Sequence, residues 1–328
     1  MFDKTMVRGL LAAALVASVA TVQAETITMA MVTVGDPGNA ADTTGYGAVG
    51  YTYQMGKYDV TAAQYTAFLN AVARTGDPYG LYNSNMAADA SYGCGISRSV
   101  TSGTYSYATT KNGNFPVNYV SWGDAARFSN WLQNGQPNGL EGNGTTETGT
   151  YTLNGDVSSL MEARNPGATY FIPSENEWYK SAYYKGGGTN AGYWQYPTKS
   201  NTAPSNVLSA SGTNNANFDN NGYTDPTNYL TPVGYFAGSP GPYGTYDQAG
   251  DVSQWTEADV GGSSRGLRGG TFLSSSIYME ASVRFNVIPS VEASNLGFRV
   301  ASTPEPGSIA LLLAGALAFG IWRQRRNA

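Results

Sequence analysis

Long segments rich in turn-forming residues place the strongest limit on how this chain can fold. Residues 76–118, 134–169 and 186–230 are dominated by Gly, Asn, Ser and Thr, and the 328-residue chain contains 41 Gly. Such segments predict loops with short strands. Loops of this length inside a compact domain must be held by something other than regular hydrogen-bonded elements. We therefore expect an irregular fold with few helices.

Three short helices are predicted between these loops, because three segments carry the pattern of a helix start. In each, a Ser or Thr is followed three residues later by a side chain that can bond back to the backbone, and apolar residues then recur at helical spacing. The pairs are Thr61 with Gln64, Ser121 with Asp124, and Ser174 with Glu177. The likeness of the first two segments has two explanations, an internal duplication or the sequence rules that all helix starts share.

Strands are expected late in the chain, from Arg265 to Leu273 and from Leu296 to Ala301. No break in composition divides the sequence between the two ends into separate cores. The pattern therefore favours a single α+β domain.

The composition excludes several classes of protein. Charged residues make up only 12% of the chain and hydrophobic residues 41%, which is the opposite of the balance in disordered proteins. The net charge of −5 excludes a nucleic-acid partner bound through a basic face. Histidine is absent, which excludes Ser-His-Asp and Cys-His nucleophile pairs and metal sites built on His. A single cysteine, Cys94, excludes an intrachain disulfide and a Cys-rich metal site.

The N-terminal 24 residues have the three parts of a secretory signal. Basic Lys4 and Arg8 precede an apolar run over residues 10–20, and small Val22 and Ala24 stand where a signal peptidase reads the chain. We expect cleavage before Glu25, with a buried N-terminal helix as the alternative.

The C-terminal residues 304–328 also have three parts: Pro304-Glu305-Pro306, an uncharged stretch over 307–322, and a basic end. A helix over that stretch would span roughly 24 Å at about 1.5 Å per residue, which is short for a membrane core of about 30 Å. The basic end belongs on the cytoplasmic side, so the preceding domain would lie outside. This end resembles the PEP-CTERM sorting signal of Gram-negative bacteria. The resemblance implies an exosortase-type sorting partner, and a location at the cell surface or outside it, with the helix as a transient or stable anchor in the inner membrane.

The remaining domain, residues 25–303, is acidic. It keeps 21 acidic and 13 basic residues, a net charge of −8. For an exported domain, this excess of carboxylates indicates either solubility alone or bound divalent cations.

Seven short motifs follow one another between residues 30 and 302. They read YDVT from Tyr58, PVNYVSW from Pro116, IPSENEW from Ile172, PV from Pro232, YDQAGDV from Tyr246, RGGTF from Arg268 and NLGFR from Asn295. This ordered set resembles the formylglycine-generating (sulfatase-modifying factor) enzyme family. The resemblance implies a single C-type-lectin-like domain that is low in regular secondary structure and stabilised by calcium.

The same resemblance implies two structural Ca²⁺ sites. The first would use Asp247, the backbone of Gly250 and Val252, and Gln254, where the family has Glu; Gln supplies an oxygen but no charge, which weakens the site. The second would use Asn217, Asp225 and the backbone of two further residues, Phe218 and Thr227. Ordinary turn chemistry is the alternative explanation for both aspartates.

The catalytic residues that the resemblance implies are missing. The family's oxidase converts a substrate cysteine to formylglycine with two cysteines, five residues apart, that hold soft copper(I). Counted from Gly269 and Gly270, the matching positions are Ser274 and Met279, and the family's Trp between the calcium ligands is Ser253. We therefore expect no copper and no catalytic residue. Related branches that use histidine-bound iron are excluded by the absence of histidine.

Other candidate residues are more simply explained as structural. Cys94 is expected to be an inert buried side chain rather than a reactive thiol. Three arginines of the late strand region are expected to form structural ion pairs rather than to anchor a substrate: Arg268, Arg284 and Arg299. The tripeptide Gln136-Pro137-Asn138 has a superficial likeness to the sugar-selecting tripeptide of calcium-dependent lectins, but its companion motif is absent.

These observations favour an exported, surface-sorted and non-catalytic domain that acts as a binding or structural module of the cell surface or extracellular matrix. Its partners would be extracellular polysaccharide or surface peptides. Two alternatives remain: an oxidase of the same family with altered metal ligands, and a pseudoenzyme that binds a peptide without oxidising it.

Overall fold

The computed structural model describes residues 26–303, and the three predicted helices are confirmed within it. Helix α1 spans Ala62–Val72, α3 spans Trp122–Gln133 and α4 spans Glu175–Tyr183, each with a complete capping box at its first turn. A short helix, α2 (Asn85–Ala88), and a 3-10 turn, η1 (Ser276–Met279), were not predicted. The predicted signal segment (1–24) and sorting segment (304–328) lie outside the described residues. Within the described residues, no helix is long and apolar enough to cross a membrane.

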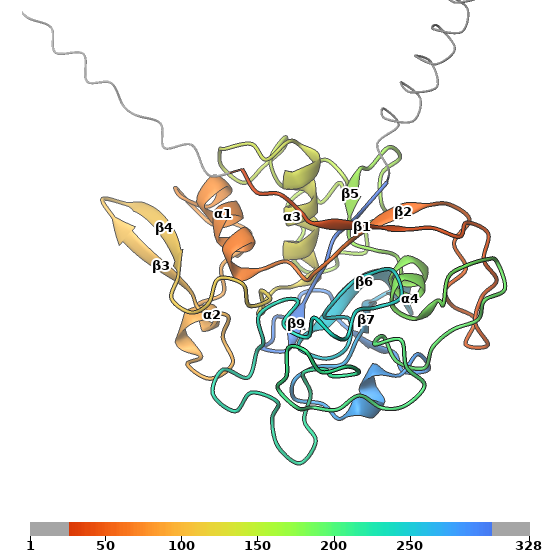
Figure 1. The fold of residues 1–328 in the computed structure, drawn as a ribbon. Coiled ribbons are helices and arrows are strands. Elements are labelled where there is room, and N and C mark those ends of the chain that lie inside the picture. The colour runs from red at the N-terminus through yellow and green to blue at the C-terminus, as the bar shows by residue number, and fades with distance from the viewer. Residues whose placement is uncertain (1–25, 304–328) are drawn as a thin grey trace, which may run out of the picture.

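One small sheet joins the two ends of the domain. Its antiparallel strands follow the order β1-β2-β10-β5. Figure 1 labels β1, β2 and β5 of this sheet. The bounds are Met31–Val34 for β1, Tyr53–Gly56 for β2, Tyr170–Phe171 for β5 and Ala301–Ser302 for β10. The final strand therefore closes the fold by pairing between β2 and β5.

A second sheet, ordered β8-β7-β6-β9, carries the late motifs. Only its β6–β9 pair is parallel. The bounds are Ser253–Val260 for β6, Ser264–Arg268 for β7, Phe285–Val287 for β8 and Leu296–Gly297 for β9. A separate hairpin of β3 (Ile96–Thr101) and β4 (Thr104–Thr109) stands at one edge of the molecule beside α1 (Figure 1).

Both strands expected late in the chain are shorter in the structure. The first ends at Arg268, because Gly269 and Gly270 adopt φ values of +107° and +72° and turn the chain. The second is divided, since residues 296–297 pair with β6 while residues 301–302 pair with β2. The residues between them carry the chain from one sheet to the other.

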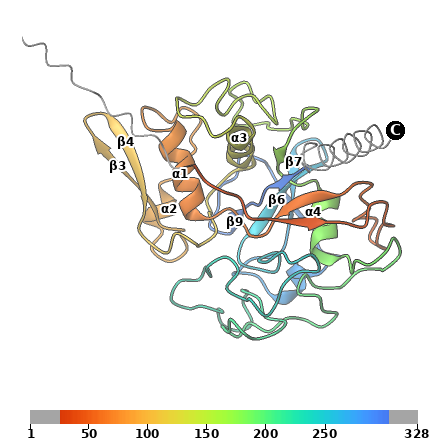
Figure 2. The ribbon, with the colours of Figure 1, turned by 45° about the horizontal axis from the view of Figure 1, so that its top comes forward.

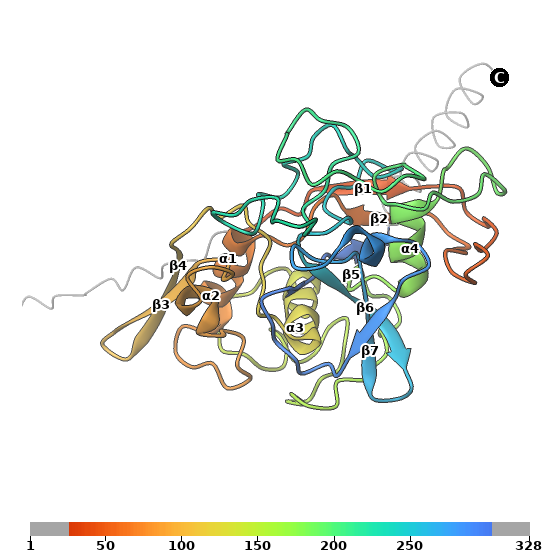
Figure 3. The same cartoon turned by 90° about the horizontal axis from the view of Figure 1, so that it is seen from below.

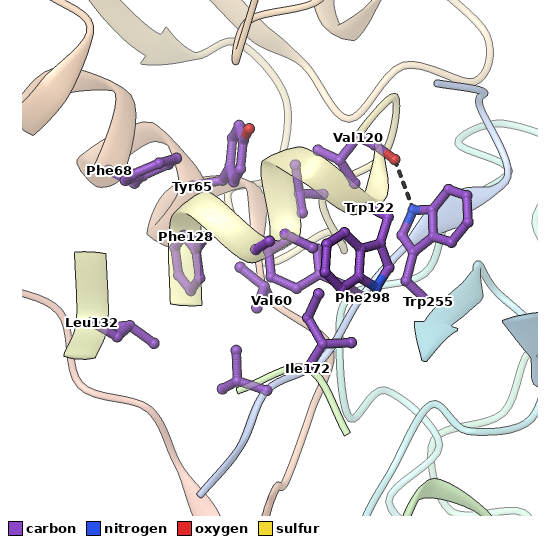
Figure 4. Close-up of a cluster of buried hydrophobic side chains, with 14 of the residues drawn as sticks. Val60, Tyr65, Phe68, Val120, Trp122, Phe128, Leu132, Ile172, Trp255 and Phe298 are labelled. Carbon is purple, nitrogen blue, oxygen red and sulfur yellow. Dashed lines mark hydrogen bonds between the residues drawn. The ribbon is translucent and has the colours of Figure 1, made fainter. Parts of the chain in front are cut away.

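Aromatic side chains join α1, α3 and the final motif in one core (Figure 4). The ring of Phe128 lies 6.1 Å from that of Tyr65, and 5.4 Å from those of Phe68 and Phe298. The indole Nε1 of Trp255 donates to the carbonyl of Val120 at 3.0 Å (Figure 4). The buried cluster takes residues from Val34 to Ala301, as a single α+β domain requires.

The predicted loops are held largely by side chains. Asn130 of α3, for example, donates from Nδ2 to the carbonyls of Thr146 and Tyr151, and Arg127 forms a buried ion pair of 2.7 Å with Glu147. Residues 186–230 contain only isolated bridges and lie on the side of the domain away from α3 (Figures 2 and 3). This arrangement confirms the predicted irregular C-type-lectin-like fold.

Candidate functional site

The chain after β7 makes two tight turns that shape the candidate site. At Gly270, a Cβ atom would lie 2.9 Å from the Cγ of Met279, so only glycine fits its left-handed backbone here. The next turn is closed by Ser274, whose Oγ accepts from the backbone N–H of Thr271 at 2.7 Å and donates to its carbonyl at 3.0 Å. The hydroxyl of Ser274 therefore forms both of these hydrogen bonds within its own turn.

Ser274 lies at the edge of a surface pocket of about 260 Å³. Among residues 26–303, no charged side chain lines this pocket. The rings of Tyr278 and Phe285 lie 5.2 Å apart and are 39% and 40% exposed. The lining residues come from β6, β7 and the turns that follow it, η1, β8, and the start of β9 with the residue before it: Ser253, Leu267, Gly270, Thr271, Ser274, Tyr278, Phe285, Asn286, Asn295 and Leu296.

Met279 does not line the pocket. Its side chain is fully buried in a separate cluster with Tyr196, Ala216, Phe218 and Ala249. Ser274 precedes the 3-10 turn η1, and Met279 is the last residue of that turn. The two side chains that replace the family's copper ligands therefore have different surroundings, one at the surface pocket and one in the core.

The three predicted arginine ion pairs are confirmed. Arg268 and Arg284 both pair with Glu175, at 2.7 and 2.9 Å, and Arg299 pairs with Asp59 at 2.9 Å. Both members of the Arg299–Asp59 pair are fully buried, and burial raises the pKa of Asp59 while the guanidinium acts in the opposite direction. These arginines hold the domain together and do not face the pocket.

The remaining candidates also have structural roles. Cys94 is fully buried, and burial raises the pKa of its thiol to about 11, which keeps it protonated and unreactive at neutral pH. The side chain of Gln136 bonds to the backbone N–H and carbonyl of Ile27 at 2.8 and 2.9 Å. Gln136 therefore secures the N-terminal segment.

The first set of predicted calcium ligands does not fit the ion. Oε1 of Gln254 already accepts from Nε1 of Trp178 and from Nε of Arg299, both at 2.6 Å. The carboxylate of Asp247 accepts from the backbone N–H of Gly234, at 3.0 and 2.9 Å from its two oxygens. The side-chain oxygen of Gln254, which was expected to bind the ion, therefore faces the guanidinium of Arg299.

Gly250, one of the two backbone ligands predicted for the first calcium site, lies against Asn217 of the second predicted site. A Cβ at Gly250 would lie 1.9 Å from the carbonyl oxygen of Asn217, so these two segments touch directly. Gly250 has a φ of +77°, and Val252 is fully buried. The structure thus places Asn217 against the first set rather than apart from it.

The second set fits calcium better. Oδ1 of Asn217 is buried and has no hydrogen-bond partner among the described residues, as a ligand oxygen would be. The carboxylate of Asp225 accepts from the side-chain Nδ2 of Asn228 at one oxygen and from the N–H groups of Thr227 and Asn228 at the other. Burial raises the pKa of Asp225, but these hydrogen bonds outweigh it and lower the pKa overall. The carbonyl of Phe218 accepts from the hydroxyl of Thr224 at 3.0 Å and keeps a second lone pair. All four residues offer oxygen, which is what Ca²⁺ prefers.

Four pocket residues were not predicted as functional: Tyr278, Phe285, Asn286 and Asn295. The side chains of Asn286 and Asn295 form no hydrogen bond with the described residues, which leaves two carboxamides open to a ligand. Asn295 begins the NLGFR motif, and this was the one available signal. Phe285 and Asn286 are brought to the pocket by the pairing of β7 with β8, and Tyr278 by its place in η1, neither of which the sequence shows.

Comparison with known proteins identifies the family. The model of the sulfatase-modifying factor enzyme 1-like domain matches residues 26–304. No curated protein matches the chain.

Three similar solved structures have low sequence identity to this chain. The crystal structure of CarF is 20% identical, with a TM-score of 0.53, over 85% of this chain and 100% of that one. Treponema denticola variable protein 1 is 19% identical, with a TM-score of 0.49, over 86% and 98%. PvdO from Pseudomonas aeruginosa is 18% identical, with a TM-score of 0.44, over 84% and 92%. Because the family model covers nearly all of the described residues, the chain belongs to the sulfatase-modifying factor (formylglycine-generating enzyme) family.

Proposed function

We propose that this chain is a non-catalytic member of its family that acts as a binding or structural module outside the cell. The chemistry and surroundings of Ser274 and Met279 carry the proposal: the hydroxyl is hydrogen-bonded within its own turn, and the thioether is buried in the core. A copper(I) site of the family's kind needs two soft thiolate ligands. Neither position supplies a thiolate, and only Met279 offers sulfur.

The test is an oxidation assay on the exported domain, residues 25–303. The protein is incubated with copper, oxygen and a cysteine-bearing peptide, and aldehyde is measured. We expect none, and we expect no copper retained after gel filtration. The double variant Ser274→Cys/Met279→Cys is the matched control for the lost ligands. Aldehyde made in turnover by the unaltered domain would establish the oxidase with altered ligands instead.

Export and surface sorting belong to the same proposal. The signal-like residues 1–24 and the PEP-CTERM-like residues 304–328 support it, with an exosortase-type enzyme as the sorting partner. Cell fractionation together with mass spectrometry of the mature termini tests it. We expect an N-terminus at Glu25 and protein at the cell surface or in the medium. Protein confined to the cytoplasm with residues 1–24 intact would contradict it.

The pocket at Ser274 is the proposed contact site for the ligand, extracellular polysaccharide or a surface peptide. Its two unbonded carboxamides can each donate and accept, and its two exposed rings offer apolar faces. Because charged groups are absent from the lining, the group bound there would be uncharged. Pull-down with matrix polysaccharide and with surface peptides separates a matrix module from a peptide-binding pseudoenzyme.

We also propose that the second set of oxygens holds one structural Ca²⁺. The side chains of Asn217 and Asp225 and the backbone of Phe218 and Thr227 would hold it. The ion would join the segment at Asn217 to the turn at Asp225, two parts of a long loop with little regular structure. The unpartnered oxygen of Asn217 supports this assignment.

A further inference from the structure

We infer that the side-chain amide of Gln254 has replaced the calcium ion of the first set. The amide is bonded at both of its ends. Its Oε1 accepts from Trp178 and Arg299, as described above, and its Nε2 donates to the backbone carbonyl of Asp247 at 2.6 Å. One neutral side chain on β6 thus connects helix α4, the segment between β9 and β10, and the loop at Asp247.

The orientation of this amide is fixed by its neighbours. If the amide were rotated by half a turn, its NH₂ group would face two N–H donors, from Trp178 and Arg299. Its oxygen would then face the carbonyl oxygen of Asp247. All three hydrogen bonds would be lost, and buried polar groups would be left without partners. Gln254 therefore cannot turn its oxygen toward a cation beside Asp247.

A glutamate at position 254 could both accept these hydrogen bonds and bind an ion. One of its carboxylate oxygens could accept from Trp178 and Arg299, while the other would lie where Nε2 now lies and could bind an ion. Glutamine has a single oxygen, and that oxygen is already used. The buried guanidinium of Arg299 adds a positive charge at Gln254, which opposes a second cation.

The test compares calcium binding by the domain of residues 25–303, its Gln254→Glu variant and its Asn217→Ala variant. Each protein is freed of metal with EDTA, dialysed and titrated with CaCl₂ by calorimetry, and its melting temperature is measured with and without calcium. For the unaltered domain we expect one ion per chain, lost in the Asn217→Ala variant. For the Gln254→Glu variant we expect a second ion and a larger rise in melting temperature with calcium.

Each result decides the inference. Two ions in the unaltered domain, or one that survives Asn217→Ala, would overturn it, as would no added ion in Gln254→Glu. No ion in the unaltered domain, with one gained by Gln254→Glu, supports it and removes the separate proposal for the second set. Crystals grown with calcium give the same decision if a variant fails to fold, because an anomalous peak beside Gln254 in the unaltered domain would refute the replacement.

Discussion

The surroundings of Arg299 and the pocket at Ser274 differ in how deeply their side chains are buried and in how many hydrogen bonds those side chains form within the domain. Arg299 is fully buried, and its guanidinium donates to Gly56, Asp59, Tyr246 and Gln254. In the pocket, by contrast, the carboxamides of Asn286 and Asn295 bond to no described residue, and the rings beside them are partly exposed.

This difference explains how a chain can keep a family fold without the family's chemistry. Removing a buried, fully bonded side chain leaves several unsatisfied groups, so the residues around Arg299 are constrained by stability. Residues that line an open pocket contribute little to stability and are free to change with the ligand. Ser274, one of the two copper positions, belongs to this second region, whereas the other, Met279, is a core residue.

Replacing Arg299 should have the largest effect on stability. Arg299→Met leaves the carboxylate of Asp59 buried without its cation, and such a loss costs about 3–5 kcal/mol. The matched control is Arg284→Met, because Arg284 is 27% exposed and its partner Glu175 would keep Arg268. For the control we expect about 1 kcal/mol or less. Urea unfolding of residues 25–303 measures both, and equal losses would contradict the comparison.

The second prediction concerns a buried carboxyl that has no ion pair within 4 Å among the described residues. Burial, with the nearby Glu292, raises the pKa of Asp124 to about 8. Since the folded state then binds the proton more tightly than the unfolded state, this contribution is complete below pH 4 and is lost as pH rises to about 8.

The size of this effect is a few kcal/mol, because each pKa unit corresponds to about 1.4 kcal/mol. The variant Asp124→Asn keeps an oxygen for the backbone N–H of Ser121 but does not titrate. Its free energy of unfolding should therefore fall less between pH 4 and pH 8 than that of the unaltered domain. Parallel pH profiles for the two proteins would show that Asp124 is not the titrating group.

Calcium removal should have the next largest effect. If the second set binds one ion at a concentration about a hundredfold above its dissociation constant, binding adds about 2.7 kcal/mol. EDTA should therefore lower the melting temperature, and added CaCl₂ should restore it. In Asn217→Ala the difference between the two conditions should disappear. An unaltered domain that melts at one temperature in both would refute the proposed ion.

The parts of the fold that were predicted are those with local causes. The helix starts at Thr61, Ser121 and Ser174 are set by side chains three residues away, so the sequence alone indicates them. Strands β1 and β2 were not predicted because each has only four residues, and β2 pairs with β10 near the far end of the domain. Strand β6 was not predicted because its buried and exposed side chains do not alternate. The division of residues 296–301 between two sheets likewise depends on distant partners.

The candidate site was predicted in position but not in geometry. Counting from the double glycine found Ser274, yet nothing in a five-residue spacing shows that η1 turns Met279 into the core. The role of Gln254 depends on Trp178 and Arg299, which lie 76 and 45 residues away in sequence. The sequence, read beside the family motif, shows Gln where the family has Glu. It does not show that the NH₂ group of Gln254 donates to the carbonyl of Asp247.

The smallest effect on stability is expected in the pocket, and there binding should respond instead. The double variant Asn286→Ala/Asn295→Ala should change the free energy of unfolding by no more than about 0.5 kcal/mol, as surface substitutions usually do. It should nevertheless lose the retention on matrix polysaccharide or surface peptide that the unaltered domain shows.

The matched control for this experiment is Asn220→Ala, since Asn220 is exposed and does not line the pocket. Urea unfolding gives the stability of all three proteins, and pull-down gives their binding. If the pocket variant binds as well as the control, the ligand contacts another face of the domain. If its free energy of unfolding falls by several kcal/mol, the two carboxamides stabilise the fold. The proposed contrast between a fully hydrogen-bonded interior and a pocket with unbonded side chains would then be wrong.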